Sequence, residues 1–421
     1  MGRSSLIMVM GFNIMFAAMG YTITDVAEWG YKNYVGYYQR TVAQKIAESV
    51  TNMALTEIDM SPNWRTGYSN DSLMGGLYSV TVTNGDSATQ IRVNVFVQYD
   101  SVTYTDSLQM GLRQFSEFAY FSNVEGSINW ATGDTVWGPF HTQDKMNIDG
   151  HPVFEGYTTA KGGYTKKTGS SYPTFLGGYK SGVNIPLPTS FSSMVKTAKD
   201  AGAYFYNKDV YLQFNSDGTV TYSLNSWAGT PTTVPLNTLA PNGVLADTNG
   251  NLHLKGTLSG KITVSAVQGS LNTTGNVYFD SSVTYKYDPL KPVGTPEDDL
   301  LGVVCDNNAI VSDNTNNNNA AKGVKIEASM ICRNGGLGAQ NYSSRGLAGT
   351  LTLLGGVQQY QRGAVASLDG SGNVTSGFNK SYRYDDRLRI ESPPLYPSTN
   401  SYKPLAWYES VVSSNWFWKT L

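Results

Sequence analysis

The sequence has few of the residues that metal and redox chemistry require. Its 421 residues include only three histidines, His141, His151 and His253, and two cysteines, Cys305 and Cys332. These are too few for zinc clusters, haem attachment or iron–sulfur ligation. The nucleophile elbow, the phosphate-binding loop and the dinucleotide fingerprint are also missing from the sequence. We therefore expect no metal site, no cofactor and no enzymatic activity.

Charge is scarce as well. Charged residues make up 15% of the chain, against about 25% in an average protein. Thirty Lys and Arg residues oppose 32 Asp and Glu residues, so no field of one sign is available to attract nucleic acid. The 40% hydrophobic and 12% aromatic content excludes disorder for most of the chain, and the 44 glycines are typical of β proteins with tight turns.

The two cysteines allow two interpretations. In an exported chain, Cys305 and Cys332 most simply form one disulfide, worth about 3 kcal/mol through the unfolded-state entropy that it removes. Two buried free thiols are the alternative. The cysteines enclose residues 306–331, which include the asparagine-rich stretch 314–319. We expect the loop enclosed by the cysteines to contain, at this asparagine-rich stretch, a flexible surface segment that forms no core.

The N-terminus predicts one long helix over residues 1–60. Residues 4–24 carry no charge and are long enough to cross a bilayer. A signal peptide cleaved near residues 17–19 is the alternative. We assign the apolar side chains of this third to assembly with other helices: Leu6, Ile7, Val9, Phe12, Ile14, Phe16 and Met19.

The second part of the predicted helix, residues 26–58, is amphipathic. It contains no proline, and an apolar residue recurs at every fourth position along one stripe, made of Val42, Ile46, Val50, Ala54 and Ile58. We expect this stripe to pack against the β-rich body. Ser61-Pro62 should end the helix, giving a rod about 75–80 Å long.

The rest of the chain predicts β structure, so the fold class is α+β and mostly β. Residues 61–127 form a linking region with a β-hairpin around Asn84-Gly85 and a short helix near 115–121. In residues 128–421, short apolar runs alternate with turns at Gly, Asn or Asp. Strands this short must stack to bury their faces, which favours a β-solenoid-like body, a parallel β-helix. A β-sandwich is the alternative.

The long apolar helix ahead of an exported β-rich body resembles the anchor of type IV pilins and pseudopilins. The start Arg3-Ser4-Ser5-Leu6-Ile7 is similar to that of PilX-type minor pilins, although Ser5 stands where pilins usually carry a glutamate. Later stretches resemble a β-rich domain of unknown function in bacterial envelope proteins, namely 118–121, 133–142, 148–156, 300–308 and 382–397.

This resemblance implies a structural subunit of an extracellular, type IV pilus-like filament at the cell surface, exported through the bacterial envelope. It implies self-association, or association with other pilins, through the N-terminal helix, and residence in the inner membrane before assembly. The alternative function is a membrane-tethered surface adhesin, or a glycan-binding or glycan-active β-helix protein. Surface glycans are therefore possible partners.

Several polar clusters could form sites, but we expect them to be structural. His141 and His151, with Asp144, Asp149 and Glu155 nearby, could form a weak metal or acid–base site, but we expect turn residues bonded to the backbone. Two stretches place oxygen ligands at alternate positions, as calcium loops do, but Asx turns explain both without an ion: Asp247 to Asn251 and Asp369 to Asn373. We interpret two acidic clusters as solvated loop charges: Glu297-Asp298-Asp299 and Asp385-Asp386.

Overall fold

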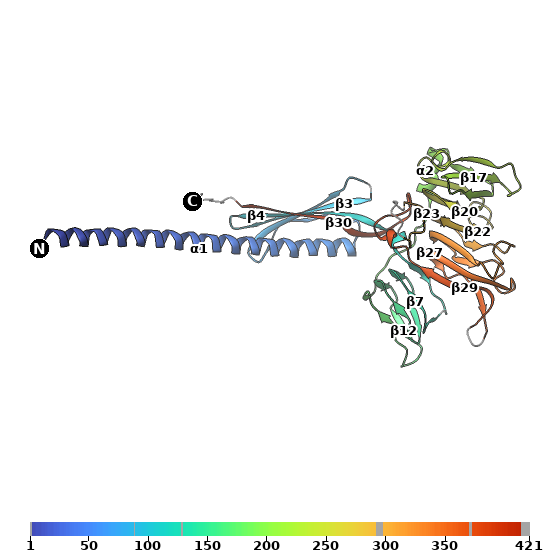
Figure 1. Ribbon diagram of the computed structural model, residues 1–421, viewed down its shortest axis with the longest axis horizontal. Coiled ribbons are helices and arrows are strands. Elements are labelled where there is room, and N and C mark those ends of the chain that lie inside the picture. The colour runs from blue at the N-terminus through green and yellow to red at the C-terminus, as the bar shows by residue number, and fades with distance from the viewer. Residues whose placement is uncertain (1, 88, 128, 292–297, 370–372, 414–421) are drawn as a thin grey trace. The chain divides into compact units, whose positions relative to one another are not determined.

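A computed structural model of the protein describes residues 2–87, 89–127, 129–291, 298–369 and 373–413. The chain consists of one long N-terminal helix followed by a mostly β body (Figure 1). It divides into two compact units. Unit 1 comprises residues 1–112 and 401–421, and unit 2 comprises residues 113–400.

The helix α1 spans Arg3–Met60 without interruption. It ends where the sequence predicts, because the Ser61 backbone N–H donates to the Glu57 carbonyl at 2.8 Å and Pro62 follows. Two polar side chains within its apolar third are bonded along the helix itself: the Thr22 hydroxyl donates to the Met19 carbonyl and the Thr24 hydroxyl to the Gly20 carbonyl, both at 2.9 Å. Because these hydroxyl groups are satisfied within the helix, the apolar third of α1 is compatible with an apolar environment.

In unit 1, a five-stranded sheet accompanies the helix. Its order is β1-β2-β3-β4-β30, with bounds Tyr68–Leu73, Gly76–Asn84, Gln90–Tyr99, Val102–Gln114 and Ser398–Ser413. The strands β2 and β3 form an antiparallel hairpin that pairs Asn84 with Ile91. The last strand, β30, joins β4 from almost 300 residues further along the chain, and the Tyr104 hydroxyl donates to the Glu409 carboxylate at 2.7 Å.

The amphipathic part of α1 packs on this sheet. Ile46, Val50 and Ala54 are completely buried, Ile58 is 2% exposed, and Val42 is partly buried. They share one core with the inward side chains of β2 and β3, which alternate along each strand as a half-buried sheet requires. The stripe therefore packs against the sheet of unit 1, whereas the sequence analysis placed the β-rich body at residues 128–421.

The first part of unit 2 is a set of very short strands. Residues Phe115–Glu117 form a 3₁₀ turn, η1, in place of the expected short helix at 115–121. The strands that follow are β5 (Tyr120–Val124), β6 (Asn129–Ala131), β7 (Thr135–Val136), β8 (Phe140–Thr142), β9 (Met146–Asp149), β10 (Val153–Phe154), β11 (Thr158–Ala160), β12 (Tyr164–Lys166), β13 (Thr174–Phe175) and β14 (Tyr179–Ser181).

These short strands pair in parallel with the strand three elements later. One ladder is β5-β8-β11-β14, the second is β6-β9-β12 and the third is β7-β10-β13. Buried aromatic rings stack from one rung to the next: the Tyr120 and Phe140 ring centroids lie 5.1 Å apart at an interplanar angle of 7°. Each strand is too short to bury a face alone, so stacking supplies the core.

The second part of unit 2 begins with α2 (Ser192–Asp200) and contains longer strands. They are β15 (Tyr204–Tyr206), β16 (Val210–Phe214), β17 (Thr219–Leu224), β18 (Thr232–Pro235), β19 (Val244–Thr248), β20 (Leu252–Leu258), β21 (Lys261–Val267), β22 (Val277–Tyr285), β23 (Leu300–Cys305), β24 (Ala309–Val311), β25 (Val324–Cys332), β26 (Leu337–Ala339), β27 (Leu347–Gln361), β28 (Ala366–Leu368) and β29 (Val374–Arg383). The short helix α3 (Leu236–Leu239) follows β18, and the 3₁₀ turn η2 (Asp386–Arg389) follows β29.

From β19 onward, a strand pairs in parallel with the strand two elements later. β15 and β16 pair instead with β19 and β20, because the antiparallel strands β17 and β18 intervene. One ladder runs β15-β19-β21-β23-β25-β27, and the second runs β16-β20-β22-β24-β26. The end of β27 pairs with β5, which connects the first ladder to the short strands. Apolar side chains of these ladders share one buried core, which includes Leu252, Leu254, Ile262, Val264, Val277 and Phe279.

The Asn-rich loop expected at 306–331 is not one loop, because the segment contains β24 and most of β25. The stretch 314–319, expected to be flexible and to form no core, lies between these two strands, and one of its asparagines belongs to the interior. Asn317 is fully buried, and its Nδ2 donates to the carbonyls of Phe279 at 2.8 Å and Ser312 at 3.0 Å. An asparagine can satisfy buried backbone groups as well as coat a surface, and composition alone does not distinguish these roles.

The packing of α1 on its sheet predicts the cost of a charge there. Ile46→Asp should lower the free energy of unfolding of unit 1 by about 3 kcal/mol or more, because it buries an unpaired carboxylate. Met53→Asp is the matched control, since Met53 lies on the same helix and is 39% exposed. Thermal unfolding of both variants in detergent measures the difference, and equal melting temperatures would show that the Ile46 face is not buried.

Candidate functional site

The apolar side chains in the first third of α1 are left exposed by the described part of the chain. The side chains assigned to assembly keep between 45% and 70% of their surface exposed: Leu6, Ile7, Val9, Phe12, Ile14, Phe16 and Met19. The helix is long and apolar enough to cross a membrane, by length and composition, and its most apolar stretch is entirely unburied. So much apolar surface on one element marks it as a binding surface.

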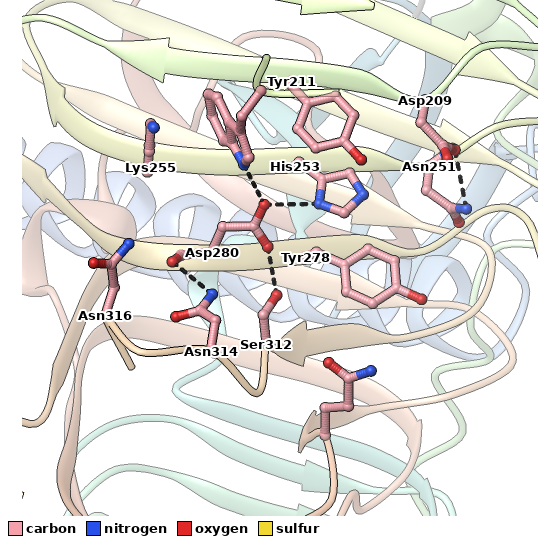
Figure 2. A pocket seen from close by; sticks show the side chains of 12 residues that line it. Asp209, Tyr211, Asn251, His253, Lys255, Tyr278, Asp280, Ser312, Asn314 and Asn316 are labelled. Atoms are coloured by element: carbon pink, nitrogen blue, oxygen red, sulfur yellow. Dashed lines mark hydrogen bonds and ion pairs between the residues drawn. The ribbon is translucent and has the colours of Figure 1, made fainter. Parts of the chain in front are cut away.

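A second candidate site lies on the outer face of unit 2, where three aromatic rings stack. Parallel register places Tyr211 of β16 beside His253 of β20, and His253 beside Tyr278 of β22. The His253 ring lies 4.1 Å from the Tyr211 ring and 4.8 Å from the Tyr278 ring, both at 10° (Figure 2). Side chains alternate along a strand, so this outward row accompanies the inward row that includes Leu212 and Leu254.

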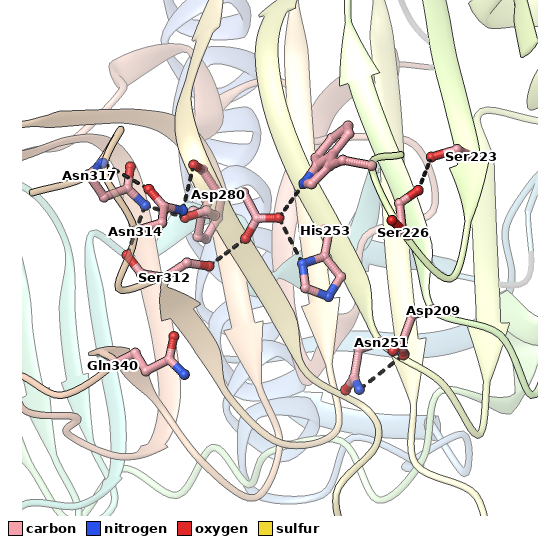
Figure 3. Close-up of polar contacts among 12 residues, drawn as sticks. Asp209, Ser223, Ser226, Asn251, His253, Asp280, Ser312, Asn314, Asn317 and Gln340 are labelled. Carbon is pink, nitrogen blue, oxygen red and sulfur yellow. Dashed lines mark hydrogen bonds and ion pairs between the residues drawn. The ribbon is translucent and has the colours of Figure 1, made fainter. Parts of the chain in front are cut away.

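Asp280 anchors this stack. Its carboxylate accepts hydrogen bonds from His253 Nδ1 at 2.8 Å, Trp227 Nε1 at 2.6 Å and the Ser312 hydroxyl (Figure 3). Burial acts to raise the pKa of Asp280, but the hydrogen bonds and charge of His253, with those of Ser312 and Trp227, outweigh burial and lower it. Since an ionised carboxylate only accepts, Nδ1 of His253 carries the proton, and Nε2 is directed away from Asp280.

The residues around the stack form a groove of about 760 Å³. Lys255 Nζ lies 3.6 Å from the centroid of the Trp227 ring, and the Asn251 backbone N–H donates to the Asp209 carboxylate at 2.9 Å. Gln340 lines the opposite side. The groove thus combines aromatic surface with amide, carboxylate and hydroxyl groups, a combination suited to a ligand rich in hydroxyls. This site could not be predicted from the sequence, because the strand register that aligns the three rings is not visible in a single sequence.

The two histidines of the expected turns lie in different environments. His141 is in strand β8 and fully buried, which corrects its assignment to a turn. Its Nδ1 shares a hydrogen bond of 2.7 Å with the Thr159 hydroxyl, and burial lowers its pKa to about 4. His151 is exposed, with its ring 4.3 Å from that of Tyr172. Across the part of the chain that the structure describes, no group of three or more His, Cys, Asp or Glu could hold a metal ion.

Cys305 and Cys332 are free thiols in this structure, which does not support the predicted disulfide. They are register partners on the parallel strands β23 and β25, fully buried, with their Sγ atoms 3.2 Å apart. Burial raises the pKa of the Cys305 thiol, with Cys332 adding to the effect. The cysteines behave as small apolar side chains of the core, which is the alternative interpretation.

Two acidic clusters interpreted as solvated are partly structural. Asp299 is 6% exposed and accepts from the backbone N–H of Gly260 at 2.6 Å and of Lys286 at 3.1 Å. Asp385 is 3% exposed and pairs with Arg387 at 2.7 Å, whereas Asp386 is exposed. Glu297 lies outside the described residues. Acidic residues that cap backbone groups are buried with their partners, so exposure could not be inferred from charge.

The two possible calcium loops also differ from each other. Asp247 is fully buried in β19, and neither of its carboxylate oxygens has a hydrogen-bond partner. At the other loop, the backbone N–H of Asn373 donates to the Asp369 carboxylate at 2.8 Å, and residues 370–372, which include the donor of the expected Asx turn, lie outside the described residues. Burial, with a smaller effect of the Asp209 charge, raises the pKa of Asp247 to about 7.

Comparisons with known proteins give little further information. No family model matches the chain, and no curated protein matches it. Among solved structures, the competence-associated pilin ComZ from Thermus thermophilus aligns over 90% of this chain and 97% of its own length, with 10% sequence identity and a TM-score of 0.38. Similarity at this level does not establish a common fold.

The raised pKa of Asp247 predicts a pH-dependent stability. A folded-state pKa near 7, against about 3.9 in the unfolded chain, means that the folded state holds the extra proton between pH 4 and 7. Protonated Asp247 therefore makes its full contribution to the free energy of unfolding below pH 4, and this contribution is lost as the pH rises through 7. Asp247→Asn should stabilise unit 2 at pH 8 by about 2–4 kcal/mol.

Chemical denaturation between pH 5 and 8 measures this effect. Asp298→Asn, a substitution of an exposed carboxyl in the same unit, is the control and should leave the pH dependence unchanged. If Asp247→Asn showed the same loss of stability with rising pH as the parent chain, Asp247 would not be the group responsible.

Proposed function

We propose that the chain is a pilus-related subunit that assembles through the apolar third of α1. Its partners in assembly are other copies of the chain or other pilins, in a filament on the outside of the cell. Before assembly, the same helix resides in the inner membrane. The observation that carries this proposal is the contrast along one helix: Ile46 is fully buried on the sheet of unit 1, while Ile7 and Ile14 are 70% and 68% exposed.

The physical argument is the cost of leaving this surface in water. Burying one large apolar side chain contributes about 1.5–3 kcal/mol, so a row of them strongly favours either lipid or the helices of other subunits. Gly11 and Gly20 have no atom within 4 Å of an added Cβ, which leaves room for a neighbouring helix to approach closely. Because Ser5 stands where pilins usually carry a glutamate, we expect assembly of this chain to depend on apolar packing between helices.

Removal of the apolar third tests this proposal. A chain lacking residues 1–28 should be monomeric and soluble without detergent, and should be missing from material sheared off the cell surface. A full-length chain with Ile14→Asp and Phe16→Asp should show the same loss of assembly. Val26→Asp would also place a charge on an exposed position, 67% exposed but beyond the uncharged segment, and serves as the milder control. Filaments built from the truncated chain would contradict the proposal.

A second function, non-catalytic binding of glycans, is favoured by the groove around His253. Stacked rings beside a fully hydrogen-bonded carboxylate offer an apolar platform bordered by donors and acceptors, which a sugar with its hydroxyls can use. The hydrogen bonds that hold Asp280 also fix the positions of His253 and Trp227. The chain would then be a surface adhesin as well as a subunit, and not an enzyme.

Tyr278→Ala tests the groove, because it removes one ring of the stack without removing an Asp280 hydrogen bond. In a screen of glycans immobilised on a surface, this variant should bind at least tenfold more weakly than the parent chain. Tyr206→Ala, at a position 61% exposed in β15 and outside the groove, is the matched control. Equal binding by the two variants would contradict glycan recognition at the groove, and cleavage of a bound glycan would contradict a purely binding role.

A further inference from the structure

A second pocket of unit 2, separate from the groove, has a distinctive lining. It lies between the segment 130–137 and the strands β27 and β29, and its volume is about 410 Å³. Aromatic side chains and basic side chains share its walls: Trp130, Trp137, Tyr382, Arg362, Lys380 and Arg383. None of these residues belongs to the groove around His253.

The basic side chains of the pocket are not neutralised within the described part of the chain. Arg362 Nη1 is buried and has no hydrogen-bond partner, while its guanidinium carbon lies 5.2 Å from the centroid of the Trp130 ring. No described carboxylate forms an ion pair with Lys380 or Arg383, and the only acidic residue in the lining is Asp134. Leaving a buried guanidinium donor unpaired is costly, so the pocket lacks an acceptor.

Arg362 and Lys380 also affect each other. The pKa of Lys380 is lowered to about 8, chiefly because neighbouring protein atoms desolvate the ammonium group, and secondly by the positive charge of Arg362, with Asp134 opposing both. Lys380 is exposed, and it lines the same pocket as Arg362, so the two like charges repel. An anion between them would relieve this repulsion and supply the missing acceptor.

We propose that this pocket binds a saccharide unit that carries a carboxylate. The carboxylate accepts hydrogen bonds from Arg362 and Lys380, because hydrogen bonds between charged donors and a carboxylate are stronger than those between neutral groups. The sugar ring packs its C–H face against the aromatic walls, where Trp137 is 57% exposed and Tyr382 is 36% exposed. A small inorganic anion would satisfy the basic residues but would leave the aromatic walls bare, which is why the observations favour a ring.

Binding of oligogalacturonate to the full chain in non-ionic detergent tests the proposal. The methyl ester of the same oligosaccharide is the matched ligand control, because it keeps the sugar rings and removes the negative charge. We expect the acid to bind and the ester to bind at least tenfold more weakly. Equal binding of the two, or binding of neither, would overturn the proposal.

Variants locate the interaction at this pocket. Arg362→Gln and Lys380→Gln should each weaken binding of the acid by about tenfold, and Trp137→Ala should weaken binding of both acid and ester. Lys166→Gln, at an exposed position of β12 outside the pocket, is the matched control. Melting temperatures equal to that of the parent chain show which variants are folded, and Lys380 provides the second basic position if Arg362→Gln unfolds. Unchanged affinity in folded Lys380→Gln would overturn the proposal.

Proton uptake gives a readout that a merely structural lysine would not change. Besides Lys380, the ionisable groups lining the pocket are Asp134, Arg362, Arg383, Tyr120, Tyr382 and Tyr384. An anion beside Lys380 raises its pKa, so calorimetry at pH 8 should detect proton uptake on binding of the acid, and Lys380→Gln should abolish it. If inorganic phosphate or a short oligonucleotide competed with oligogalacturonate at equal concentration, the saccharide would not be the ligand and the proposal would fail.

Discussion

The constraint on which unit 2 depends is that a single strand cannot bury its own apolar face, least of all the strands of two to five residues in its first part. Parallel stacking in register solves this by placing equivalent positions of successive rungs on one another, as with Tyr120 on Phe140. The same register that builds the interior also arranges the exterior, because every inward position has an outward neighbour. The row of Tyr211, His253 and Tyr278 is therefore a by-product of the same register that aligns Leu212 with Leu254.

The sequence predicted the elements whose signals are local. The apolar stretch, the stripe at every fourth residue and Ser61-Pro62 placed the helix at 1–60, and the structure has it at Arg3–Met60. Asn84-Gly85 indicated the β2–β3 hairpin, but the turn itself differs from the expected one, because Asn84 still pairs with Ile91 and neither Asn84 nor Gly85 has a positive φ. The partners of these elements could not be predicted in the same way. The strand β30, far along the chain, completes the sheet beside the helix, and no local pattern indicates such a pairing.

The groove and the polar interior were hidden for a related reason. Whether Asn317, Asp299 or Asp385 is solvated depends on which backbone groups are left unpaired beside it, and this follows from the tertiary pairing of the strands. The cysteines are a similar case: their positions in register bring them together, while the chemistry of the pair was inferred from an expected cellular compartment. Composition gives the number of polar residues but not which of them become buried.

The sheet of unit 1 has a consequence for biosynthesis. The edge of β4 is covered by β30, so this sheet lacks its last strand until residues 398–413 have been made. A chain that stops earlier leaves β4 as the edge strand in place of β30, and the unpaired backbone groups of β4 can then pair with other chains. Completion of the five-stranded sheet beside the helix thus requires that translation has passed through all of unit 2, so a prematurely ended chain carries the helix with β1 to β4 alone.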